Sequence, residues 1–170
     1  MKTAILPLLS LFILFSCTPS PRTPFDREGV SFTCPRGWHI ADQESIDSAG
    51  YHLSIEKDGF NSSGLMTVSW VNGFIGDENY MDIYKTELRD NIIYRNSNLD
   101  FGDTYTGKFN EYNCLITEFT ASFIGLKHEG SLYIFYTGGK TIAILRQEAV
   151  EDKADNANGF KTLETSFAVL

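Results

Sequence analysis

Three histidines, His39, His52 and His128, are the side chains of this sequence best suited to acid–base or metal chemistry. None has a second histidine or a cysteine at the short spacing of a metal-binding pair, and the sequence contains no Cys-x-x-Cys. It also lacks the Gly-x-Ser-x-Gly elbow that presents a catalytic serine. We expect His39 and His52 on strands and His128 at a turn, each exposed or hydrogen-bonded. We predict a protein that is not an enzyme and binds no metal or cofactor.

Two short motifs are similar to ligand-binding loops but lack essential residues. The stretch GGKT at residues 138–141 matches the end of a phosphate-binding loop, yet Ile134 stands where the loop needs its first glycine, and a strand-like sequence follows instead of a helix. The stretch DGFNSSG at residues 58–64 starts like a calcium loop, yet Phe60 occupies a position that should supply an oxygen. We predict that both stretches are turns between strands.

The N-terminal residues are typical of an exported protein. Lys2 precedes an apolar run at residues 4–15, which is too short for a membrane span of about 20 residues but suits the core of a signal peptide. Residues 14–17, Leu-Phe-Ser-Cys, resemble the lipobox of bacterial lipoproteins, in which the cysteine is acylated and begins the mature chain. The resemblance implies a signal peptide at residues 1–16 and a lipid anchor on Cys17. An ordinary signal peptide cut nearby is the alternative.

Prolines follow this cysteine closely and define the next segment. Pro19, Pro21 and Pro24 are three of the five prolines in the chain, and proline interrupts both helices and central strands. We expect residues 17–28 to form an extended tether, which leaves one globular domain at residues 29–170. The lipid would hold this domain on the exported side of a bacterial membrane, in the periplasm or at the cell surface.

The charge of the chain is acidic. It carries 14 Lys and Arg against 22 Asp and Glu, a net charge of −8, and loss of Lys2 with the signal peptide leaves 13 − 22 = −9. Such a surface repels phosphate groups, so we exclude nucleic acid as a partner. For the same reason we expect the membrane to be reached through the lipid anchor rather than through a basic patch.

Cys34 and Cys114 are the two cysteines that remain after Cys17. An exported compartment permits a disulfide between them, and 79 residues lie between the two positions. Two buried free thiols on strands are the alternative, because a sequence does not show whether two Cα atoms approach each other.

Alternation of apolar and polar side chains predicts most of the domain as β-strands. In residues 51–56, for example, Tyr51, Leu53 and Ile55 alternate with polar residues. We expect strands at residues 30–33, 38–41, 51–56, 65–71, 104–109, 114–123, 126–136 and 140–148. The first two should form a hairpin that buries Trp38.

Two segments change to the helical period of 3.6 residues. The first begins at its expected N-cap, Asp77. Its apolar stripe consists of Met81, Tyr84, Leu88 and Ile92. The second covers residues 155–167, where Asn158 and Gly159 weaken the first turn. Its stripe consists of Phe160, Leu163 and Phe167. Strands joined mostly by hairpins, with two amphipathic helices packed on them, predict an α+β fold around a largely antiparallel β-sheet.

The two ends of the domain are similar to a known fold family. The stretch VSFTCPRGWHI at residues 30–40 resembles the opening of PsbP-like domains. GGKTIAIL at residues 138–145, followed by FKTLETSF at residues 160–167, resembles their end. The resemblance covers residues 30–170 and implies an α/β/α sandwich, with an antiparallel sheet between helices. It also implies a protein that binds another protein, since most members of the family act in this way.

Aromatic residues that the core does not need are the candidates for a binding surface. Trp70, Phe74, Ile75 and Tyr80 lie in or beside the loop at residues 71–80, which joins a strand to the first helix. We expect them to contact an unidentified envelope protein; capping of the core is the alternative. The predicted function is a membrane-anchored, non-enzymatic protein-binding lipoprotein. A small-ligand or lipid carrier with a cavity between sheet and helix is the second hypothesis, and a hydrolase is the third.

Overall fold

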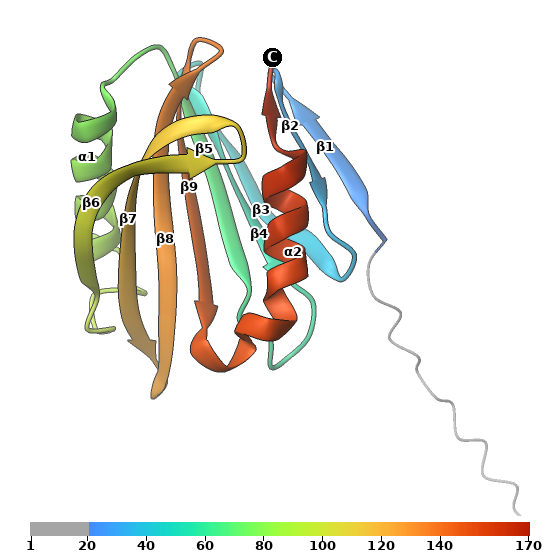
Figure 1. Ribbon diagram of the computed structural model, residues 1–170, viewed down its shortest axis with the longest axis vertical. Helices are drawn as coiled ribbons and strands as arrows, with labels where there is room; N and C mark the ends of the chain where they lie inside the picture. Colours follow the sequence, from blue (N-terminus) through green and yellow to red (C-terminus); the bar gives the residue numbers. More distant parts are fainter. Residues whose placement is uncertain (1–20) are drawn as a thin grey trace, which may run out of the picture.

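The strands of the protein form two sheets, which the computed structural model describes within residues 21–170 (Figure 1). The larger sheet has the strand order β3-β4-β5-β9-β8-β7-β6. Its strands are β3 (Trp38–Ile46), β4 (Gly50–Lys57), β5 (Leu65–Asn72), β6 (Asp100–Phe109), β7 (Tyr112–Phe123), β8 (Leu126–Thr137) and β9 (Lys140–Ala149). The smaller sheet, β1-β2-β10, consists of β1 (Thr23–Arg27), β2 (Val30–Cys34) and β10 (Ala168–Val169). Every pair of neighbouring strands is antiparallel, which confirms the predicted sheet.

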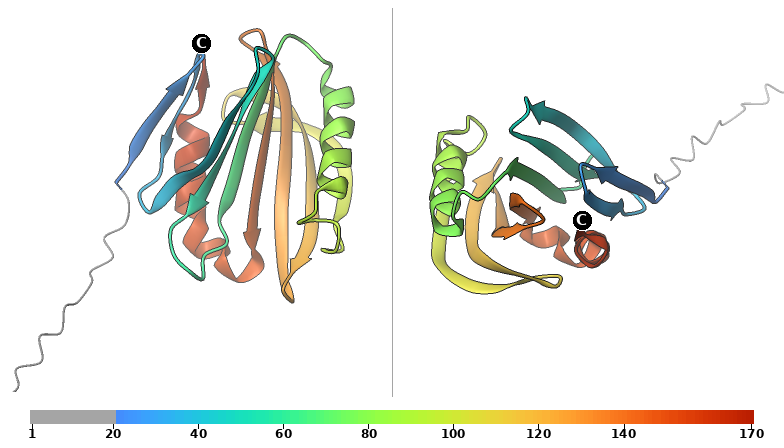
Figure 2. Two further views of the ribbon diagram at one scale, coloured as in Figure 1. Left: turned by 180° about the vertical axis from the view of Figure 1, so that it is seen from behind. Right: turned by 90° about the horizontal axis from the view of Figure 1, so that it is seen from above.

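Two helices cover opposite faces of the larger sheet (Figure 2). They are α1 (Asp77–Asp90) and α2 (Lys153–Ser166), and the short 3-10 helix Val150–Asp152 precedes α2. The side chains of β9 show that the two helices lie on opposite faces, because neighbouring residues in a strand point to opposite sides of the sheet. Ile142 and Ile144 pack in the apolar cluster of α2, whereas Ala143 and Leu145 pack in that of α1. The expected α/β/α arrangement is therefore confirmed. Neither described helix has the length and apolar character of a membrane span.

Trp38 is a central residue of the larger apolar cluster, as predicted. Its side chain is 3% exposed, and its ring meets the ring of Phe160 edge-on with centroids 5.1 Å apart. Phe160 and Leu163 are buried as predicted for the stripe of the second helix, and Phe167 is buried too, although the helix ends one residue before it, at Ser166. The helix begins earlier than expected, at Lys153, which places Gly159 in its interior rather than in its first turn.

The predicted hairpin between residues 30–33 and 38–41 is wrong. β2 pairs with β1 on one side and β10 on the other, while β3 pairs with β4. Both edges of β2 are thus occupied, which leaves none for β3. The small sheet is held against α2, where the backbone N–H of Thr33 donates to the hydroxyl of Ser166 at 2.9 Å.

The predicted tether at residues 17–28 extends too far along the chain. Residues 23–27 form β1, which pairs with β2 along its whole length. Pro24 is tolerated there because β1 is an edge strand, where a missing N–H leaves no ladder partner unpaired. Phe25 secures the strand by stacking on Phe32 at 4.7 Å. The predicted signal peptide, the lipid anchor at Cys17 and Pro19 lie outside the described residues.

The ends of α1 differ from the prediction at both termini. Its N-cap is Gly76, with no side-chain hydrogen bond, and Asp77 is the first helical residue. The helix ends at Asp90, where Asn91 turns to an extended conformation. Ile92 therefore leaves the apolar stripe and is 83% exposed. The rest of the stripe faces the sheet as expected, with Met81 and Leu88 buried.

Cys34 and Cys114 are buried free thiols, so the possible disulfide is not formed. Burial raises the pKa of each thiol to about 11, with a smaller contribution from the Asp58 carboxylate at Cys34. Both thiols therefore stay protonated at neutral pH and act as small apolar side chains.

Candidate functional site

A groove of about 890 Å³ lies between α1 and the near face of β3, β4 and β5; we call it the α1 groove. It exists because α1 packs over β7 and β8 and leaves the other half of this sheet face uncovered. In the view from above in Figure 2, α1 stands apart from β3 and β4, and residues from all three elements line the groove. A groove of this volume is large enough for this fold to receive another molecule there.

A β-bulge in β3 determines which side chains form the floor of the groove. Trp38 and Ile40 pack toward the α2 cluster. The register then shifts between Ile40 and Asp42, and this one extra residue turns the rest of the strand over. Asp42 and Glu44 consequently point to the α1 face, opposite Ser54 and His52 of β4. Without the bulge these two carboxylates would face the apolar core.

α1 forms the wall of the groove with residues from one helix face. These residues are Tyr80, Tyr84, Glu87 and Leu88, at spacings typical of a single side of a helix, and the C-cap residue Asn91 follows them. A contact between Thr67 Oγ1 and Tyr84 Oη at 3.1 Å ties this wall to the floor. This contact holds α1 and β5 together at the position of Tyr84.

A serine and a histidine meet at the floor of the groove. His52 Nδ1 lies 2.7 Å from Ser69 Oγ, and Glu44 is the cross-strand neighbour of His52. A hydroxyl beside an imidazole is the first requirement of a nucleophile and its base. However, Ser69 is only 5% exposed, and neither a hydrogen bond nor an ion pair links Glu44 to the histidine. The arrangement is better suited to holding the floor rigid than to acyl transfer.

His128 lies at one end of the groove and is buried, on β8 rather than at the predicted turn. Its ring meets Phe123 edge-on at 4.9 Å, and Gln147 Nε2 is 3.5 Å from its Nδ1. Burial lowers its pKa below the ordinary 6.5, although the carboxylates of Glu151 and Asp152 oppose the shift.

We expect His128 to make the protein less stable in mild acid. In the unfolded chain its pKa returns to about 6.5, so just below this pH the unfolded state binds more protons than the folded one. The free energy of unfolding should therefore fall as pH decreases below about 6.5, and His128→Gln should remove this part of the loss. Urea denaturation at pH 7.5 and 5.5 measures the difference. Equal pH dependence in the wild type and the variant would contradict the assignment.

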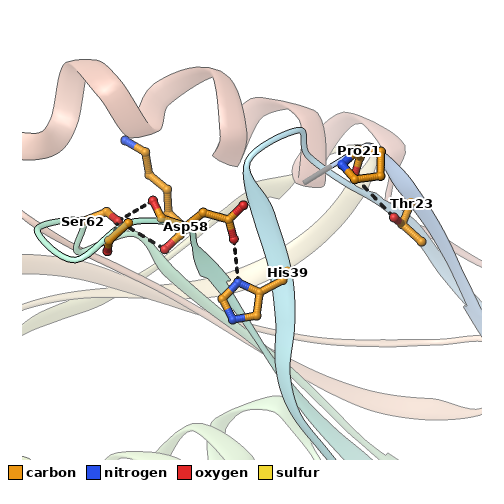
Figure 3. Close-up of polar contacts among 7 residues, drawn as sticks. Pro21, Thr23, His39, Asp58 and Ser62 are labelled. Carbon is orange, nitrogen blue, oxygen red and sulfur yellow. Dashed lines mark hydrogen bonds and ion pairs between the residues drawn. The ribbon is translucent and has the colours of Figure 1, made fainter. Parts of the chain in front are cut away.

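The third histidine, His39 on β3, is a surface residue with a partner. His39 Nδ1 lies 2.8 Å from Asp58 Oδ1 at the base of the β4–β5 turn (Figure 3). In the same turn the hydroxyl of Ser62 contacts the backbone carbonyls of Asp58 and Gly59 at 2.7 and 2.8 Å. This stretch is therefore a hydrogen-bonded turn, as predicted for DGFNSSG. Across residues 21–170 no three metal-ligating side chains converge.

Two of the four predicted partner-binding residues belong to the interior. Trp70 is fully buried, stacks on Tyr51 at 5.0 Å and donates its indole N–H to Glu28 at 3.0 Å. Tyr80 is 9% exposed and faces the sheet from the first turn of α1. The expectation that the core does not need these rings is wrong, because the alternation of β5 continues through Trp70. Phe74 is exposed, as expected, and Ile75 is partly so.

The loop that carries Phe74 is held in place by β9 and the β8–β9 turn. The N–H of Gly73 donates to the carbonyl of Gly139 at 2.8 Å. Thr141 Oγ1 accepts the N–H of Ile75 at 3.1 Å and donates to the carbonyl of Gly73 at 2.7 Å. Phe74 is therefore an exposed ring on a fixed backbone, which is a property of contact residues at interfaces.

Phe74→Ser should have little effect on folding. The ring is 68% exposed, and it meets the ring of Tyr136 edge-on at 5.1 Å. We expect the free energy of unfolding to fall by no more than about 1.5 kcal/mol, the upper value for such an aromatic pair. Trp70→Ser is the buried control and should cost several times more. A collapse of the Phe74→Ser variant in thermal denaturation would show that the loop is part of the core.

Comparison with solved structures identifies the fold. LpqN of Mycobacterium tuberculosis, a protein involved in cell envelope biogenesis, aligns with a TM-score of 0.53 and 12% identity over 88% of this chain and 90% of its own. Cyanobacterial PsbP (CyanoP) of Synechocystis sp. PCC 6803 aligns with a TM-score of 0.59 and 12% identity over 91% and 96%. The fold is therefore PsbP-like, as the terminal motifs predicted. Neither a protein-family model nor a curated protein sequence matches the chain.

Proposed function

We propose that this chain is a lipid-anchored, non-enzymatic protein of the bacterial cell envelope that binds a segment of another envelope protein in the α1 groove. The observation that carries the proposal is the groove itself, an uncovered sheet face beside a helix with about 890 Å³ of space. Its imidazole and hydroxyl groups are tied to one another in two pairs, His52 with Ser69 and Tyr84 with Thr67. They are suited to recognition rather than to turnover.

The envelope location is supported by two independent features. The lipobox-like residues 14–17 supply an acylation site, and the structurally similar LpqN is involved in cell envelope biogenesis. Anchoring can be tested with Cys17→Ala, which should release the protein from the membrane fraction or stall its processing. Metabolic labelling with a fatty acid gives the direct readout. A Cys17→Ala variant that still incorporated the label would exclude Cys17 as the anchor.

A carrier of a small ligand is the second candidate function, because the volume of the groove falls in the range of about 300–1,000 Å³ that small-molecule sites occupy. A phospholipid is a poor occupant for it. Asp42, Glu44, Glu56 and Glu87 line the groove, and these carboxylates repel a phosphate.

Ser54→Trp tests the groove by filling it. Ser54 lies on β4, faces the groove and is only partly buried, so an indole there takes up space for the ligand without replacing a core residue. Thr106→Trp is the matched control, since Thr106 is exposed on β6 at the opposite edge of the sheet. We expect the first variant to lose the partner that co-purifies from membranes and the second to retain it, with equal melting temperatures. Retention by both variants would refute the groove as the binding site.

A further inference from the structure

We propose that the segment bound in the α1 groove is basic and amphipathic, with lysine or arginine side chains along one side and apolar side chains along the other. The inference rests on the proposed function, because it names the chemistry of the polypeptide that the groove receives.

The groove is lined by acidic side chains. Four carboxylates line it, Asp42, Glu44 and Glu56 on the floor and Glu87 on the wall, and no lysine or arginine is among the described lining residues. These four are among the 22 acidic residues of the chain, and they lie together on one concave surface. A cleft lined by one sign of charge concentrates its field and attracts a ligand of the opposite sign.

These carboxylates are also unneutralised. Within the described part of the chain the ion pairs involve Asp58 and Glu129, and none involves a groove residue. Glu44, Glu56 and Glu87 have no hydrogen-bond donor among the described residues, and Asp42 accepts only the N–H of Gln43. An approaching cation would therefore meet carboxylates that no cationic side chain of the described residues neutralises.

The apolar lining of the groove indicates that the bound segment also carries apolar side chains. Ile46 and Ile93 lie in the groove with 42% and 65% of their surfaces exposed. Leu65 and Val71 of β5 are partly buried beneath them. A free cation alone would leave this apolar surface in water, whereas an amphipathic segment covers it and meets the carboxylates at the same time. Tyr84 of α1, which is only partly buried, adds a ring on which a cationic group can rest.

The dimensions of the groove favour a chain segment over a small amine. α1 has 14 residues, and at 1.5 Å per residue its wall is about 21 Å long. An extended polypeptide of about six residues spans this length at 3.3 Å per residue. β3 is the edge strand of the sheet on this side, so the groove is not closed by a further described strand.

Synthetic peptides test this chemistry on the full-length protein in a neutral detergent. The probe is a capped decapeptide of alternating lysine and valine, measured by isothermal titration calorimetry. One control replaces every lysine with glutamate, and the other replaces every valine with serine. We expect the lysine–valine peptide to bind most tightly, the lysine–serine peptide to bind more weakly and the glutamate–valine peptide not to bind. Equal binding of the glutamate–valine peptide would overturn the inference.

Charge-matched variants show whether the groove is responsible. The groove variant carries Glu44→Gln, Glu56→Gln and Glu87→Gln. The control carries Asp26→Asn, Asp103→Asn and Glu111→Gln, three exposed positions that do not line the groove and change the net charge equally. We expect about tenfold weaker binding of the lysine–valine peptide for the groove variant and little change for the control. Equal losses would refute a groove site for basic segments. Should no peptide bind while Ser54→Trp still loses the envelope partner, the basic character is refuted and the binding function stands.

Discussion

Replacing Trp38 with alanine is expected to lower the free energy of unfolding by about 3–5 kcal/mol, the range for large aromatic side chains in a core. The indole is 3% exposed and fills the space where β3, the β4–β5 turn and α2 meet. Two glycines make this position possible, because the ring lies directly against the backbones of Gly64 and Gly159. Alanine would leave a cavity with backbone on two sides, which cannot collapse easily.

Chemical denaturation followed by far-UV circular dichroism measures this loss. Phe60→Ala is the control, since Phe60 is fully exposed in the same region of the chain and should change the midpoint little. A midpoint for Trp38→Ala equal to that of the wild type would show that the indole is not packed as described.

The second large effect concerns Gly159, and its sign should depend on Trp38. A methyl group at this position would lie 2.6 Å from Cζ2 of Trp38 and closer still to Nε1. The ring is buried and cannot swing away, so Gly159→Ala should destabilise the wild type by about 1–3 kcal/mol through overpacking. Once Trp38 is alanine, the clash disappears and only helix propensity remains. Gly159→Ala should then stabilise α2 by roughly 0.5–1 kcal/mol.

The four proteins of this double-mutant cycle give the coupling between the two positions directly. The wild type, the two single variants Gly159→Ala and Trp38→Ala, and the double variant are compared by urea denaturation at one pH. A stabilising Gly159→Ala in the wild-type background would contradict the contact between the helix backbone and the indole.

Periodicity in the sequence correctly predicts the strands and helices that bury one face and expose the other. Tyr51, Leu53 and Ile55 alternate because one face of β4 is buried, and they are buried. Phe160 and Leu163 recur at helical spacing because one side of α2 packs on the core, and Phe167 is buried directly after the helix. Gly159 was expected to weaken this helix, and its actual role, making room for Trp38, depends on a contact 121 positions away in the chain.

The features that define the α1 groove are those that no local pattern encodes. The bulge between Ile40 and Asp42 reverses the faces of β3, so an alternation read from Trp38 places the acidic residues on the wrong side. The position of α1 over β7 and β8, which uncovers the other strands, is set by side-chain packing between distant segments. Trp70 was misjudged because β5 ends only two residues after it, at Asn72, where the loop follows.

A photo-cross-linking comparison in native membranes tests the central claim, that the α1 groove holds a partner polypeptide. Benzoylphenylalanine would replace Ile46 at the rim of the groove, and Tyr105 on β6 is the matched control. The two side chains are 42% and 47% exposed, on strands at opposite edges of the sheet. We expect the probe at position 46 to form a cross-link to a partner, which Ser54→Trp suppresses. We expect no cross-link from the probe at position 105. The same adduct from both positions, or from position 105 only, would contradict it.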